Sequence, residues 1–175
     1  MIPAWRQLLI DWNRTEAGYD ADRTVHEVFE ERAAEAPDAV ALVFDGATVS
    51  YGELNARANR LARHLADRGV TRGAVVGVML ERGIELVVAT LAVLKAGAGY
   101  TQLDPKFPTE RLAGLVEQTS STLVVTRTGL TPPNTDTVEV DRDADLIAAL
   151  DASNPGVRVS VEDVACVMFT SGSTG

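Results

Sequence analysis

The last six residues of the chain combine side chains and backbone freedom suited to binding an anion. Residues 170–175 read Thr-Ser-Gly-Ser-Thr-Gly and follow an apolar stretch, 164–169, that predicts a strand. Ligands of open α/β sheets bind at the carboxyl ends of strands. Glycines let backbone N–H groups turn toward an anion, and hydroxyls add donors. The sequence therefore indicates a phosphate-binding loop, and a plain Ser/Gly turn is the alternative that these residues leave open.

Other motifs for anion binding or nucleophilic catalysis do not fit. No Gly-Lys-Ser/Thr follows at the Walker spacing, and although residues 97–99 begin a dinucleotide fingerprint, Gln102 stands where its third glycine belongs. The elbow pattern Gly-x-Ser-x-Gly is absent, and no His–Asp pair is placed to activate a serine. We expect His26 in the first turn of a helix and His64 on a solvated face, so neither is assigned to catalysis.

Composition excludes several classes of protein. The 175 residues suit about one domain, and 16 Lys and Arg against 25 Asp and Glu give a net charge of −9. That charge disfavours nucleic-acid binding, which needs clustered basic residues. The single cysteine, Cys166, excludes an internal disulfide and is interpreted as a small core residue of a strand. We expect no membrane-spanning helix, no secretory signal and a cytoplasmic location.

Alternating strands and helices predict an α/β fold with a layered, mostly parallel sheet and helices on both faces. Capping boxes at Thr24 and Ser50 begin two helices, and Asp45-Gly46 predicts a two-residue hairpin turn. Further helices are expected over 84–96, 109–118 and 143–150. Strands are expected over 39–44, 47–49, 74–80, 99–103, 123–126, 137–140 and 164–169.

The spacing of apolar residues predicts which helix faces are buried. The helix after Ser50 should bury the stripe that contains Leu54, Leu61 and Leu65, and the helix over 84–96 should be covered on several sides. The first helix should bury Val25, Val28 and Phe29, and the helix over 109–118 should bury Leu112, Leu115 and Val116. The acidic pairs at 30–31 and at 141, 143 and 145 are interpreted as solvated faces or a helix N-terminus.

Residues 1–23 differ from the domain expected over 24–175. They carry both tryptophans, Trp5 and Trp12, with little periodicity and a short acidic stretch at 18–22. We interpret them as a lead-in or linker that packs its aromatic residues onto a neighbour, with a frayed terminus as the alternative.

Three stretches, in order, resemble the core motifs of nonribosomal peptide synthetase adenylation domains, in the superfamily of acyl-CoA synthetases and luciferases. Residues 49–54 resemble Leu-Thr/Ser-Tyr-x-Glu-Leu, 94–104 resemble Leu-Lys-Ala-Gly-x-Ala-Tyr-x-Pro-x-Asp, and 169–175 resemble Tyr-Thr-Ser-Gly-Ser-Thr-Gly. Gly99, Gln102 and Phe169 replace the usual Ala, Pro and Tyr. The lead-in over 8–15 is similar to a condensation–adenylation linker. An acyl-CoA synthetase is a weaker resemblance.

The resemblance implies an enzyme that activates an amino acid with Mg-ATP and passes it to the phosphopantetheine thiol of a peptidyl carrier protein. Expected partners are the rest of the adenylation domain, an adjacent condensation domain, that carrier protein and a small MbtH-like helper, without nucleic acid or membrane. The family's phosphate-binding role carries over to Thr170, Ser171, Gly172, Ser173, Thr174 and Gly175.

In this family the substrate pocket and the C-terminal catalytic lysine lie downstream of the third motif, which the chain does not complete. We therefore predict that the 175-residue chain alone is inactive, and we assign no catalytic or metal-binding residue within it. An end inside this loop resembles an artificial edge, a proteolytic nick or a chain break more than a natural terminus. The alternative is a non-catalytic stub with a structural or docking role.

Overall fold

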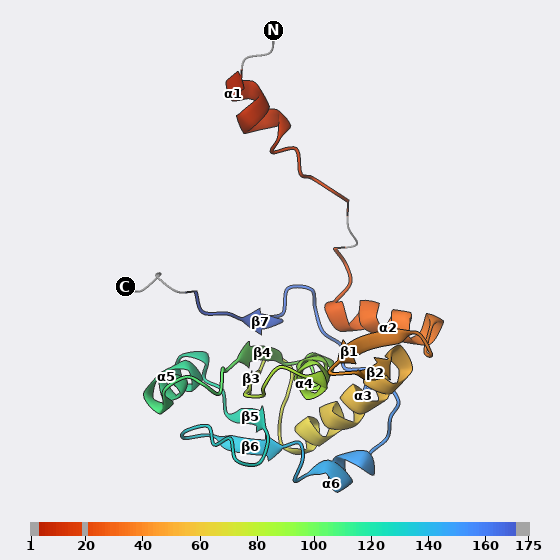
Figure 1. Cartoon of the computed structure of the whole chain (residues 1–175), viewed down its shortest axis with the longest axis vertical. Helices are drawn as coiled ribbons and strands as arrows, with labels where there is room; N and C mark the ends of the chain where they lie inside the picture. The colour runs from red at the N-terminus through yellow and green to blue at the C-terminus, as the bar shows by residue number, and fades with distance from the viewer. Residues whose placement is uncertain (1–3, 19–20, 171–175) are drawn as a thin grey trace.

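The structure is a computed structural model that describes residues 4–18 and 21–170 (Figure 1). Helices and strands alternate along most of the chain. In order, the elements are α1 (Ala4–Arg6), a π-helical turn η1 (Gln7–Asp11), α2 (Val25–Glu35), β1 (Val40–Phe44), β2 (Ala47–Ser50), α3 (Tyr51–Asp67), β3 (Val75–Val78), α4 (Ile84–Lys95), β4 (Gly99–Gln102), α5 (Thr109–Thr119), β5 (Leu123–Thr126), β6 (Asp136–Glu139), α6 (Ala144–Ala148) and β7 (Cys166–Val167).

Five parallel strands form the central sheet in the order β6-β5-β3-β4-β7, as the alternating pattern predicts. The remaining two strands, β1 and β2, pair antiparallel as a separate hairpin. Asp45 (φ 48°) and Gly46 (φ 79°) both lie in the left-handed region. A two-residue turn with positive φ at both positions matches the twist of the strands that it joins, so the predicted hairpin is confirmed.

The sheet buries a different set of side chains on each face. On one face, Val76 and Val125 pack with α3 and α4 in the larger apolar cluster. On the other, Val124 and Leu103 pack with Leu112, Leu115 and Val116 of α5. Side chains alternate between the two faces of a strand, so the predicted arrangement of helices on both faces is confirmed.

The apolar stripe of α3 faces the core, as its spacing predicts. Ser50 Oγ accepts a hydrogen bond from the Glu53 N–H at 3.2 Å and caps the helix. Leu54, Leu61 and Leu65 are buried. Most of α4 is also buried, from Val88 to Lys95 with the exception of one residue, because its sequence is apolar almost all round.

Three predictions are wrong: the buried face of α2, the length of the last strand and the burial of Cys166. Val25 and Val28 on α2 are exposed, at 65% and 47%, and the helix buries His26 and Ala33 instead. The last strand covers only residues 166–167, and Val164 and Met168 beside it are exposed. Cys166 is half-buried rather than a core residue. Among the described strands β7 lies at the edge of the sheet and pairs with β4 alone, so the apolar residues beside it are not covered by a second neighbouring strand.

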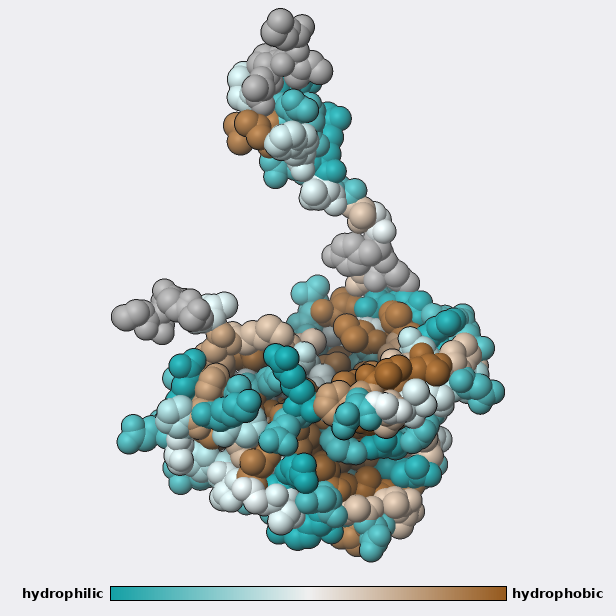
Figure 2. Space-filling view, viewed as in Figure 1, coloured by the Kyte–Doolittle hydropathy of each residue, from teal (hydrophilic) through white to brown (hydrophobic). Residues whose placement is uncertain are grey.

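The lead-in extends away from the domain (Figure 1). Trp5 and Trp12 are 59% and 64% exposed. That these rings pack onto a neighbour stays a prediction. Apolar atoms also gather at the surface over α2 and the β1–β2 hairpin (Figure 2), where Val43 and Phe44 are exposed. No helix within the described residues is long and apolar enough to cross a membrane.

Candidate functional site

The residues expected to bind phosphate follow the carboxyl end of β7. This strand pairs in parallel with β4, with Tyr100 opposite Cys166 and Thr101 opposite Val167. The Thr101 hydroxyl also donates a hydrogen bond to the Val167 carbonyl at 3.1 Å. Thr170 is exposed beyond the strand, and the predicted site residues Ser171, Gly172, Ser173, Thr174 and Gly175 lie outside the described residues. The structure thus describes the approach to the predicted loop.

Two side chains near this edge, Tyr100 and Asp104, take part in local hydrogen bonds. A hydrogen bond with Cys166 and partial burial raise the pKa of the Tyr100 phenol, which therefore remains protonated near neutral pH. In the turn after β4, Asp104 Oδ1 accepts the Lys106 N–H at 2.9 Å. These hydrogen bonds position the chain on either side of β4.

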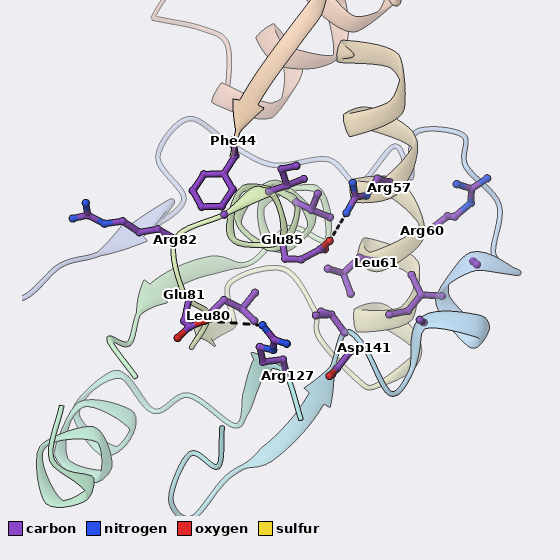
Figure 3. A pocket seen from close by; sticks show the side chains of 17 residues that line it. Phe44, Arg57, Arg60, Leu61, Leu80, Glu81, Arg82, Glu85, Arg127 and Asp141 are labelled. Atoms are coloured by element: carbon purple, nitrogen blue, oxygen red, sulfur yellow. Dashed lines mark hydrogen bonds and ion pairs between the residues drawn. The ribbon is translucent and has the colours of Figure 1, made fainter. Parts of the chain in front are cut away.

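A cavity of about 660 Å³ opens where β3 and β5 end (Figure 3). The chain leaves β3 toward β4, in the direction of one edge of the sheet, and leaves β5 toward β6 at the other edge. Crevices between two strands whose connections diverge in this way are common ligand sites. Leu61, Leu80 and Val140 contribute apolar walls. Sequence reasoning missed this cavity, because its walls come from segments far apart in the chain.

Two of the four arginines that line this cavity form ion pairs. Arg57 forms an ion pair with Glu85, and an Arg127 nitrogen lies 4.0 Å from a Glu81 oxygen (Figure 3). Paired guanidinium groups have less attraction left for a phosphate. The cavity thus combines apolar walls with charges of both signs, and we assign none of its residues to phosphate binding.

Two expectations about charged residues, for His64 and Glu30, are wrong, whereas Asp143 lies at a helix N-terminus, one of the two predicted placements. His64 lies in the interior rather than on a solvated face, with Nε2 3.6 Å from Asp143 Oδ2. Asp143 is itself buried where α6 begins, and Glu30 is only partly exposed because it pairs with the buried Lys95. His26 lies in the first turn of α2, as predicted, and burial lowers its pKa. Within 4–18 and 21–170, no group of three or more His, Cys, Asp or Glu could hold a metal ion.

Comparisons with known proteins agree with the fold and with the three motifs. A family model described as AMP-binding enzyme matches residues 29–175. Chondramide synthase cmdD of Chondromyces crocatus is 42% identical over 176 aligned residues, which cover 97% of this chain and 4% of that protein. The chain therefore spans a small part of this much longer relative.

Two crystal structures of the nonribosomal peptide synthetase FmoA3 share the fold. The AMPPNP-bound form matches with a TM-score of 0.84 and 28% identity, over 97% of this chain and 18% of that one. The form bound to α-methyl-L-serine-AMP matches with a TM-score of 0.80 and 30% identity, over 88% and 18%. With the family match over 29–175, these similarities show that the chain belongs to the AMP-binding enzyme family and resembles the adenylation part of nonribosomal peptide synthetases.

Proposed function

We propose that this chain is the N-terminal part of an adenylation domain of nonribosomal peptide synthesis. The observation that carries the proposal is the family match that continues through residue 175, together with a parallel strand, β7, that leads into the hydroxyl-rich loop. Support for an aminoacyl adenylate comes from the FmoA3 form that holds α-methyl-L-serine-AMP.

In the proposed reaction an amino-acid carboxylate oxygen attacks the α-phosphorus of ATP. A new O–P bond forms, the bond to the bridging oxygen breaks, and pyrophosphate leaves with that electron pair. Residues 170–175 would donate N–H and O–H hydrogen bonds to the β- and γ-phosphates, where negative charge accumulates as pyrophosphate departs. A carrier-protein phosphopantetheine thiol then takes the acyl group, and AMP leaves.

Mg²⁺ would neutralise part of the phosphate charge. The described residues bring together no acidic cluster to hold it, so we assign no step to the ion. The proposal also includes a condensation domain next to the lead-in, whose Trp5 and Trp12 are exposed, and an MbtH-like helper. It places the protein in the cytoplasm, where ATP and amino acids are available.

The test is ATP–pyrophosphate exchange over a panel of amino acids, with the domain completed by its downstream residues. We expect exchange with one amino acid or a few, and none from the 175-residue chain by itself. A completed, folded domain that exchanges with no amino acid would contradict the proposal and favour the non-catalytic stub. Thioester formation between CoA and a fatty acid would instead place the domain among acyl-CoA synthetases.

A further inference from the structure

A connecting segment, residues 150–163, joins α6 to the strand that enters the proposed phosphate loop. Residues 151–163 are exposed or only half-buried, so little apolar burial holds them in place. Their contacts with the domain are mainly polar and come from α3, from the end of α4 and from Arg72. The segment leads directly into β7.

Asn154 anchors the middle of this segment. Its side-chain oxygen accepts hydrogen bonds from Asn55 Nδ2 and Asn59 Nδ2, both at 2.9 Å, and lies 3.5 Å from Lys95 Nζ. Asn59 is fully buried, and so is the side chain of Lys95, which also pairs with Glu30. Buried donors that lose their acceptor are costly, so this cluster favours one position for Asn154.

Neighbouring side chains of α3 fix the residues just before Asn154. Asn59 also donates to the Ala152 carbonyl at 2.7 Å. Arg63 donates to the carbonyls of Asp151 and Ser153, each at 3.1 Å. These contacts join backbone groups of the connecting segment to a helix whose opposite face is buried in the core. The position of the segment therefore depends on a helix that is packed into the core.

Asp163 anchors the end of the segment. Its two carboxylate oxygens accept from Arg72 Nε at 2.6 Å and Arg72 Nη2 at 3.1 Å, a bidentate geometry. The Ser160 N–H donates to the same carboxylate at 2.8 Å. Immediately afterwards, the Val164 carbonyl oxygen would lie 2.6 Å from a Cβ at position 99. Gly99 thus permits the close approach of the chain that Asp163 holds.

We propose that Asn154 and Asp163 are positioning residues for ATP binding: they fix the connecting segment so that β7 pairs with β4 in one register. The chain continues from β7 into the residues to which the proposed function assigns the phosphates. The inference rests on the proposed function. Neither residue is assigned a contact with ATP. Both act through the backbone that leads into the loop.

The first test compares three single variants of the completed adenylation domain. Asn154→Leu removes the acceptor, Asn154→Asp retains an acceptor, and Arg158→Leu changes an exposed side chain of the same segment. For Asn154→Leu we expect the Michaelis constant for ATP to rise about tenfold and that for the amino acid to change less than about twofold. The other two variants should stay close to the unaltered domain.

The second test uses the ion pair at the end of the segment. Asp163→Arg should raise the Michaelis constant for ATP, and the double variant Arg72→Asp/Asp163→Arg should restore part of the loss, because the exchanged charges pair again while the Ser160 N–H still lacks its acceptor. A double variant as impaired as the single one would contradict positioning by this pair. This test also stands if Asn154→Leu does not fold.

Amide hydrogen exchange over residues 150–167 separates the two proposals. Asn154→Leu and Asp163→Arg should accelerate exchange there, while residues 54–65 of α3 should keep their protection. If the unaltered domain activates no amino acid, the proposed function fails, and amide exchange still shows whether the anchors hold the segment. If Asn154→Leu and Arg158→Leu behave alike in both exchange and ATP kinetics, the inference is overturned.

Discussion

The core around α3 and α4 and the connecting segment that leads to β7 are held by different forces. In the core, Leu61, Leu65 and Val93 are almost entirely buried among other apolar side chains. In the segment, the chain is attached by directional contacts such as those at Asn154 and Asp163. Apolar burial stabilises the fold by about 25 cal/mol per Å² but does not favour one orientation of the groups in contact. A hydrogen bond adds only about 0.5–1.5 kcal/mol, but it requires a defined distance and angle between donor and acceptor.

This difference suits the two roles. The proposed loop must bind and release a polyphosphate, so the chain that leads to it needs a defined position without extensive burial. The polar contacts of Asn154 and Asp163 give the chain that position. The parallel sheet and its helices need cooperative stability, which the two apolar clusters provide. We therefore expect changes in the core to act on global unfolding and changes near the segment to act locally.

The largest effect is expected in the core. Leu61→Ala should lower the free energy of unfolding by about 2–5 kcal/mol, because it removes buried atoms and leaves a cavity. Urea denaturation of the purified chain measures this change. Leu146→Ala on α6, where the side chain is 65% exposed, is the control and should stay within about 0.5 kcal/mol. Equal effects from both changes would show that α3 does not pack as described.

A smaller, local effect is expected where the segment meets the sheet. Gly99→Ala places a Cβ 2.6 Å from the Val164 carbonyl oxygen, so β7 must move. The free energy of local opening around residues 164–167 should fall by about 1–3 kcal/mol, as for other overpacked sites. Amide exchange reports it. Gly114→Ala in α5, with its nearest neighbour at 3.8 Å, should leave these amides unchanged.

Removal of a helix cap tests local structure on the core side. Ser50→Ala deletes the acceptor of the Glu53 N–H and should cost about 1 kcal/mol of unfolding free energy. Thermal or urea unfolding measures it, and Ser50→Asp should retain most of the stability because a carboxylate also caps helices. If the alanine variant is as stable as the unaltered chain, the cap is not formed in solution.

The smallest effect concerns pH at the start of α2. Glu27 accepts hydrogen bonds from the N–H and hydroxyl of Thr24, both at 2.8 Å, and the backbone bond is the main cause that lowers the pKa of Glu27. Because the folded-state pKa is below the unfolded value, the stabilisation is present above that unfolded value and lost as pH falls through the folded one. Glu27→Gln should flatten the fall in stability on acidification below the ordinary pKa of a glutamate. An unchanged slope would contradict the cap.

Local sequence signals predict local structure well in this chain. The Asp45-Gly46 turn and the Ser50 cap each depend on neighbouring residues, and both occur where the sequence indicates them. The parallel sheet with helices on both faces also follows from the alternating pattern and from apolar spacing.

Pairs between distant residues account for what the sequence did not predict. The local sequence indicates that Glu30 is exposed, but the fold places Lys95, 65 positions away, beside its carboxylate. His64 likewise lies in the interior, with Nε2 3.6 Å from Oδ2 of Asp143 at the start of α6. The apolar sequence around β7 predicted a longer strand, but only β4 pairs with it. The loop itself was indicated by its motif, and residues 171–175 lie outside the part of the chain that the structure describes.

The most direct measurement removes the loop hydroxyls in the completed domain and determines ATP and amino-acid binding separately. The variant replaces Thr170, Ser171 and Thr174 with alanine. We expect the Michaelis constant for ATP to rise and turnover to fall, while amino-acid affinity stays near that of the unaltered domain, because the loop is proposed to contact only the phosphates. Unchanged adenylation kinetics with a collapse of amino-acid affinity would place the loop in the substrate pocket and contradict the phosphate site.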